Sequence, residues 1–135
     1  MPSQLRMQRI NDRMREELSV MVVMEISDPR LSGISITDVK VDREFTYADI
    51  FVSAVEGHER AEEILEGLNH ASGYIRKSLS ERIELRIFPR LRFHWDPTPE
   101  KADHIEKLLA SIRAEQKPAP APTEDNPEES ARDEQ

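Results

Sequence analysis

The sequence predicts an α+β domain in which a three-stranded sheet carries helices on one face. Three observations lead to this prediction. Apolar residues recur at helical spacing over residues 3–26, two runs at 34–41 and 47–55 have strand composition, and helical periodicity returns before a third strand-like run at 86–95. The predicted order is helix, strand, strand, helix, kink, helix, strand, helix, which is typical of the α+β class.

The first helix is predicted over residues 3–26. Charged residues occupy its outer faces, and its apolar stripe recurs every three or four positions at Ile10, Met14, Leu18, Met21 and Val22. The helix should end before Pro29, because the residue that precedes a proline is disfavoured in helical conformation.

The next two runs predict an antiparallel hairpin. Residues 34–37 alternate apolar and polar, and the phase then slips so that Val39 and Val41 become the apolar positions. Such a slip indicates a β-bulge near Thr37 or Asp38. The run 47–55 is rich in β-branched and aromatic residues, and the connection over 42–46 is short enough for a hairpin.

A broken helix is predicted after the hairpin. Helical periodicity begins near Glu59, meets Ala71-Ser72-Gly73 and resumes as far as Ile83. Glycine inside a helix costs about 1 kcal/mol relative to alanine, so the interruption predicts a kink or a close approach of another group. Small residues let an RNA backbone approach closely, and the N-terminus of the following helix favours binding of a phosphate. A glycine that only caps the preceding helix explains the pattern equally well.

The third strand is predicted over residues 86–95, with Pro89 at an edge or bulge because proline has no backbone donor. One face should carry Arg86, Phe88, Arg90, Arg92 and His94. A last helix should follow with Thr98 as N-cap and Pro99 as its first residue.

The net charge of −8 hides a segregated distribution. Residues 117–135 carry six acids, two bases and no large apolar residue, so we expect a disordered acidic tail after a domain of residues 1–116. Residues 56–66 hold five acids against Arg60, and residues 76–92 hold six bases against two acids. Because phosphate binding depends on the local charge, this distribution permits an RNA partner.

Several classes of function lack their motifs. The absence of cysteine excludes disulfides, thiolate zinc sites and cysteine nucleophiles, and it fits a reducing cytoplasm. The four histidines have no metal-ligand spacing, and no P-loop, dinucleotide loop or nucleophile elbow occurs. No apolar run is long enough for a membrane span, and the N-terminus lacks the apolar core of a signal peptide. We expect no catalytic residues, no metal, no cofactor and no membrane partner.

Five segments in this order resemble the ribosome-binding factor A family over about residues 4–113. They are Asp28-Pro29-Arg30, the run 48–53, the run 68–76, the run 85–93 and the Asp96 entry to the last helix. The resemblance implies a type II KH fold in which the Ala71-Ser72-Gly73 kink replaces the usual Gly-x-x-Gly loop. It also implies binding to the free small (30S) ribosomal subunit and help with late maturation of its rRNA at the 5′ end. The acidic tail departs from the family pattern.

The expected RNA contacts combine a basic cluster with the kink. They are Arg76, Lys77, Arg82, Arg86, Arg90 and Arg92, with Ala71, Ser72 and Gly73 as the point of backbone approach. Arg6, Arg9 and Arg13 of the first helix are possible additions. The arginines of the strand are equally consistent with a merely solvated sheet face. We expect a cytoplasmic monomer; the alternative is a protein-interaction module that uses the acids of 59–66 or the tail to recognise a basic partner.

Overall fold

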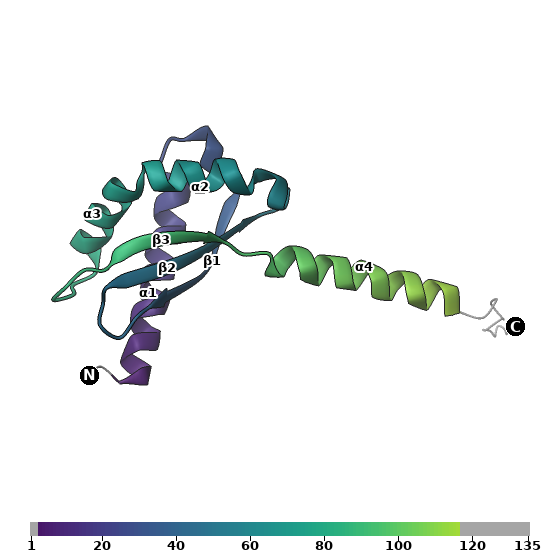
Figure 1. Ribbon diagram of the computed structural model, residues 1–135, viewed down its shortest axis with the longest axis horizontal. Coiled ribbons are helices and arrows are strands. Elements are labelled where there is room, and N and C mark those ends of the chain that lie inside the picture. Colours follow the sequence, from purple (N-terminus) through teal and green to yellow (C-terminus); the bar gives the residue numbers. More distant parts are fainter. Residues whose placement is uncertain (1–2, 117–135) are drawn as a thin grey trace, which may run out of the picture. The chain divides into compact units, whose positions relative to one another are not determined.

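The computed structural model describes residues 3–116 and divides the chain into two units, residues 1–100 and 101–135. The elements follow the predicted order (Figure 1). They are α1 (Gln4–Met24), β1 (Ile34–Val41), β2 (Tyr47–Ala54), α2 (Ala61–His70), α3 (Ser72–Arg82), β3 (Arg90–Trp95) and α4 (Thr98–Gln116), with short 3₁₀ turns at Pro29–Leu31 and His58–Arg60. The α+β prediction is confirmed. The predicted acidic tail, residues 117–135, lies outside the described residues.

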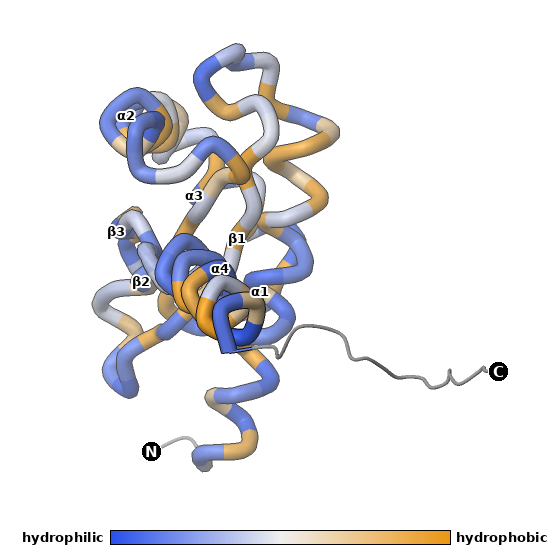
Figure 2. Tube along the Cα trace, turned by 90° about the vertical axis from the view of Figure 1, so that its right-hand side faces the viewer, coloured by the Kyte–Doolittle hydropathy of each residue, from blue (hydrophilic) through white to orange (hydrophobic). Residues whose placement is uncertain are grey.

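Helix α1 begins and ends close to its predicted limits. The Ser3 hydroxyl caps it by accepting the Arg6 amide hydrogen at 3.0 Å. Hydrophobic and hydrophilic residues alternate along the helix (Figure 2). The whole predicted apolar stripe is buried, and Met7 extends it by one turn.

The sheet is mixed, with the strand order β1-β2-β3. Strands β1 and β2 are antiparallel, and the register shifts between Ile36 and Asp38, which confirms the predicted bulge. The bulge lets the Thr37 hydroxyl reach the Asp96 carboxylate at 2.6 Å. Strand β3 pairs in parallel with β2.

The helices α1, α2 and α3 share one hydrophobic core with one face of the sheet. Buried core residues include Leu18 of α1, Ile50 of β2, Ile64 of α2, Leu79 of α3 and Phe93 of β3. Alternation along the strands sends the remaining side chains to the opposite face, which no helix of residues 3–100 covers. We call this the open face; its residues are Asp38, Lys40, Tyr47, Asp49, Phe51, Arg90, Arg92 and His94.

Strand β3 is shorter than predicted. It begins at Arg90, whose amide hydrogen is donated to the Thr46 carbonyl at 2.9 Å. Pro89 is fully buried and has no hydrogen to extend the ladder, so Arg86 and Phe88 lie in the connecting segment 83–89. The prediction that Arg86, Arg90 and Arg92 share one strand face was therefore wrong.

Helix α4 begins at Thr98. This is one residue earlier than the prediction of Thr98 as N-cap and Pro99 as first residue, and the Asp96 carboxylate accepts the amide hydrogen of Thr98 at 2.9 Å. Within residues 3–116, no helix combines the length and the apolar character that a membrane crossing requires.

Candidate nucleic-acid interface

The predicted kink is a break of one residue between α2 and α3. Ala71 closes α2 by donating its amide hydrogen to the Gly67 carbonyl at 3.0 Å, and its own carbonyl accepts the Ile75 amide hydrogen at 2.9 Å. Ser72 and Gly73 already belong to α3, so Gly73 is not the cap of α2.

Gly73 itself is not required by strain or by packing. The glycines with positive φ among the described residues are Gly33 and Gly57, and a Cβ built on Gly73 meets nothing within 4 Å. The surface at the first turn of α3 is thus open to a ligand. Contact of Ala71, Ser72 and Gly73 with RNA stays a prediction.

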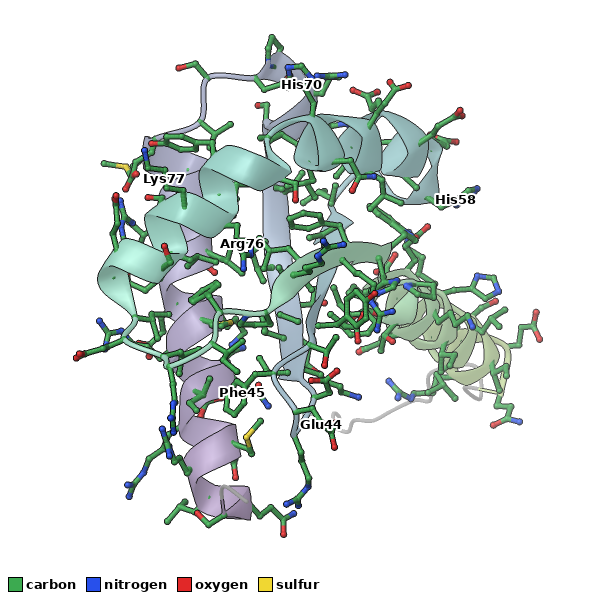
Figure 3. All side chains as sticks on the ribbon, turned by 60° about the vertical axis from the view of Figure 1, so that its left-hand side comes forward. Glu44, Phe45, His58, His70, Arg76 and Lys77 are labelled. Carbon is green, nitrogen blue, oxygen red and sulfur yellow. The ribbon has the colours of Figure 1, made fainter. Side chains whose placement is uncertain are left out.

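The three basic residues of α3 have different surroundings. Arg76 donates to the carbonyl oxygens of Phe88 and Pro89, at 2.7 and 3.0 Å. Figure 3 shows Arg76 directed toward β3 and Lys77 directed away from it. Arg82 is hydrogen-bonded to Glu25 and lies 3.6 Å from Glu17, and its bond to Glu25 raises its pKa above the ordinary value.

Of these three, Lys77 has both its charge and its hydrogen-bond donors available. It is exposed, and no acidic partner for it, Glu81 included, is found among residues 3–116. Lys77 lies one helical turn after Gly73, on the same side of α3. Arg76 and Arg82 instead hold the segment before β3 and the C-terminal part of α1.

Arg86 contributes to a different surface from the one predicted. The segment 83–89 and the N-terminal half of α1 form a groove of about 360 Å³, and a second hollow of about 250 Å³ shares Arg6 and Leu85 with it. We call the two together the basic groove. Its charged residues are Arg6, Arg9, Arg13, Arg86 and Glu84.

The basic groove has an excess of unpaired positive charge. Arg13 bonds to Glu17 and to the Arg82 carbonyl, but Arg6, Arg9 and Arg86 have no acidic partner within residues 3–116. Phe45, at the tip of the hairpin, and Ile87, with 62% of its surface exposed, add apolar area beside these charges. Guanidinium groups next to apolar surface suit a phosphate backbone with partly exposed bases.

Arg90 and Arg92 lie on the open face, away from the basic groove. Arg92 donates to both oxygens of Asp49, at 2.8 and 3.1 Å, and its guanidinium lies 3.9 Å from the centre of the Tyr47 ring. Arg90 is exposed and has no acidic partner within residues 3–116. The two arginines are two residues apart on β3 and lie on the same face, yet of the two only Arg90 is free to neutralise a phosphate.

Asp49 lies at the centre of the open face. Its Oδ1 also accepts a hydrogen bond from His94 Nε2 at 2.7 Å. Burial acts to raise the pKa of Asp49, but the hydrogen bonds from Arg92 and His94 outweigh it and leave that pKa below its ordinary value. The Asp49 carboxylate therefore stays charged and holds the Arg92 and His94 side chains in place.

Four open-face residues that contact their neighbours there were missed by the sequence reasoning: Lys40, Tyr47, Asp49 and Phe51. Phe51 stacks on His94 with a centroid separation of 5.1 Å, and Lys40 lies 5.8 Å from the Phe51 centroid. The alternation of residues 47–52 could have placed Tyr47 and Phe51 on one face. Their contact with β3 depends on a parallel pairing that no local pattern indicates.

Comparison with known proteins decides the family. The family model described as ribosome-binding factor A matches residues 6–109. A ribosome-binding factor A of Alcanivorax borkumensis is 40% identical over 111 residues, which cover 82% of this chain and 81% of that protein. The chain belongs to the ribosome-binding factor A family.

Solved structures of ribosome-binding factor A proteins share the fold. A solution structure of a putative ribosome binding factor A from Thermotoga maritima has a TM-score of 0.60 and 26% identity, covering 70% of this chain and 90% of the other. A Thermus thermophilus ribosome binding factor A homology model, fitted into the cryo-EM map of a 30S–RbfA complex, has a TM-score of 0.51 and 24% identity, covering 62% and 87%. The KH-like α+β fold of the ribosome-binding factor A family is thereby confirmed for this chain.

Proposed function

We propose that this protein binds the free small ribosomal subunit during its late assembly and assists maturation of 16S rRNA at the 5′ end, without catalysing a reaction. Membership of the ribosome-binding factor A family carries this proposal. The Thermus thermophilus relative, studied as a complex with the 30S subunit, supports the choice of partner. Its proposed partner is a cytoplasmic particle, which favours a cytoplasmic location; that the protein acts as a monomer stays a prediction.

RNA binding is assigned mainly to the basic groove. Arg6, Arg9 and Arg86 carry charges that no acid within residues 3–116 neutralises, so each is available to a phosphate. Lys77 and the open first turn of α3 at Gly73 extend the contact. Each phosphate neutralised by such a cation releases counterions, so the affinity must fall steeply with salt.

Arg76 and Arg82 act through the fold in this proposal. Arg76 fixes the position of the segment that presents Arg86, since it bonds to the carbonyls of Phe88 and Pro89. Arg82 ties the end of α3 to Glu17 of α1 and to Glu25, the C-cap of α1. Both were expected to touch RNA directly, and here they are positioning residues for the groove.

The alternative of a protein-interaction module has less support. Two of the four acids proposed for it lie near cations of this chain: Glu63 is 3.8 Å from Arg60 and Glu66 is 3.7 Å from Arg30. Charges already engaged within the chain are weaker attractants for a basic partner.

Gradient sedimentation of a cell lysate tests the proposal. We expect the protein to travel with free small subunits, to leave them at high salt, and to be absent from translating ribosomes. Binding of purified protein to isolated small subunits should show the same salt dependence. Sedimentation at the top of the gradient at low salt, or association that persists after the RNA is digested, would contradict the proposal.

A further inference from the structure

The open face of the sheet is organised as a set of flat, charged groups rather than as an ordinary solvated surface. In the pairing register, Phe51 lies opposite His94, and Asp49 lies between Lys40 and Arg92. Tyr47 lies opposite Arg90 and under the guanidinium of Arg92. Rings of β2 and β3 and the guanidinium groups of β3 therefore lie side by side on one surface, with Lys40 of β1 next to them.

Two of these groups are held in fixed orientations and still reach solvent. Asp49 accepts hydrogen bonds from both Arg92 and His94, so one carboxylate sets the planes of a guanidinium and an imidazole. The Arg92 side chain is 49% exposed and the His94 side chain 42% exposed. Planar groups that are fixed before a ligand arrives lose little rotamer freedom when it binds.

The open face carries two acids, Asp38 and Asp49, against three bases, and the cations that lack an acidic partner suit a polyanion with exposed bases. Lys40 and Arg90 are exposed and have no acidic partner within residues 3–116, while Arg92 and His94 are anchored on Asp49. Free cations at the rim attract phosphates, and the flat groups between them present surfaces on which unpaired bases stack. A duplex, whose bases are already stacked, offers this surface only its phosphates.

We propose that the open face is a second RNA-binding surface, which takes an unpaired RNA segment by stacking its bases on Phe51, His94 and the Arg92–Tyr47 pair. This inference rests on the proposed RNA partner and adds to it a substrate class: single-stranded rather than double-helical RNA. The basic groove contacts backbone phosphates, whereas the open face selects for unpaired bases.

The test uses the full-length protein and two probes of equal length, an unpaired oligouridine and an RNA duplex. Phe51→Leu removes the flat ring and keeps an apolar side chain in the cross-strand contact. We expect it to weaken oligouridine binding about tenfold, the effect of losing one base stack, and to leave duplex binding unchanged. If Phe51→Leu does not fold, the same two binding measurements are made on Tyr47→Leu.

A matched pair of histidines provides the control. His94→Leu should weaken oligouridine binding, and His104→Leu, which is on α4 and is not one of the open-face residues, should not. Melting curves establish that each variant is folded.

Four outcomes would overturn the inference. The first is that the parent protein does not bind oligouridine. The second is that the folded Phe51→Leu, Tyr47→Leu and His94→Leu variants bind oligouridine like the parent. The third is that these variants lose oligouridine binding and duplex binding equally. A Phe51→Leu variant that loses small subunits but binds oligouridine like the parent would mean that the face contacts a ribosomal protein, which also overturns it. Binding of the parent protein to small subunits tests the proposed function separately. Failure of the proposed function is therefore distinguishable from failure of this inference.

Discussion

Two glycines of the α2–α3 region should respond in opposite directions to the same substitution. A Cβ on Gly67 would lie 3.0 Å from the buried Leu31 side chain and 3.3 Å from Arg30 Cβ, so Gly67→Ala requires these groups of the 3₁₀ turn to shift by a few tenths of an ångström. Overpacking of this kind costs about 1–3 kcal/mol, and the better helix propensity of alanine returns about 1 kcal/mol. The expected net loss of unfolding free energy is about 1 kcal/mol.

Gly73→Ala provides the matched comparison. Its Cβ meets no atom within 4 Å and its φ is not positive, so alanine should stabilise α3 by about 0.5–1 kcal/mol. For a folded unit of this size, about 4–8 °C correspond to 1 kcal/mol, so the two variants should melt at least about 6 °C apart. The assay is thermal unfolding followed by circular dichroism. If the melting temperature of Gly67→Ala equals or exceeds that of Gly73→Ala, then α2 does not pack on the 3₁₀ turn as closely as described.

Three further predictions follow from charges. Arg92→Ala should lower the melting temperature more than Arg90→Ala, because only Arg92 bonds to Asp49; equal melting curves would contradict this pairing. Asp49 has a depressed pKa, so its stabilising contribution is present above its ordinary value of 3.8 and is lost as the pH falls below that value; acid titration of parent and Asp49→Asn should show a shallower decline for the variant. Replacing the six acids of residues 117–135 by their amides should strengthen RNA binding at low salt, since a tethered polyanion competes with RNA; unchanged affinity would exclude that competition.

Local sequence patterns correctly predict the elements that are determined by residues close together in the sequence. The stripe of α1 and the bulge of β1 follow from the spacing of apolar residues, and the structure has both in place. The break at Ala71 likewise follows from a short run of small residues. The length of β3 was overestimated because alternation continues through Pro89, although the missing amide hydrogen prevents pairing before Arg90.

The candidate site was harder to predict, because it depends on contacts between distant segments. Arg86 joins Arg6 and Arg9 only once α1 lies beside the segment 83–89. Arg60 lies in an acidic stretch, which suggests a solvated charge, yet it donates to the carbonyls of Arg30 and Ser32, at 2.9 and 2.7 Å. Charge counts along the sequence cannot separate such structural arginines from available ones.

The salt dependence of small-subunit binding tests the central claim most directly. The variant carries alanine at Arg6, Arg9 and Arg86, and Arg15→Ala is the control, since Arg15 lies on α1 but lines a different groove with Val20 and Ile36. If the three arginines neutralise phosphates, the slope of log affinity against log salt should fall by about 2 to 3 units, and Arg15→Ala should keep the parental slope. A folded triple variant with the parental slope would contradict the account.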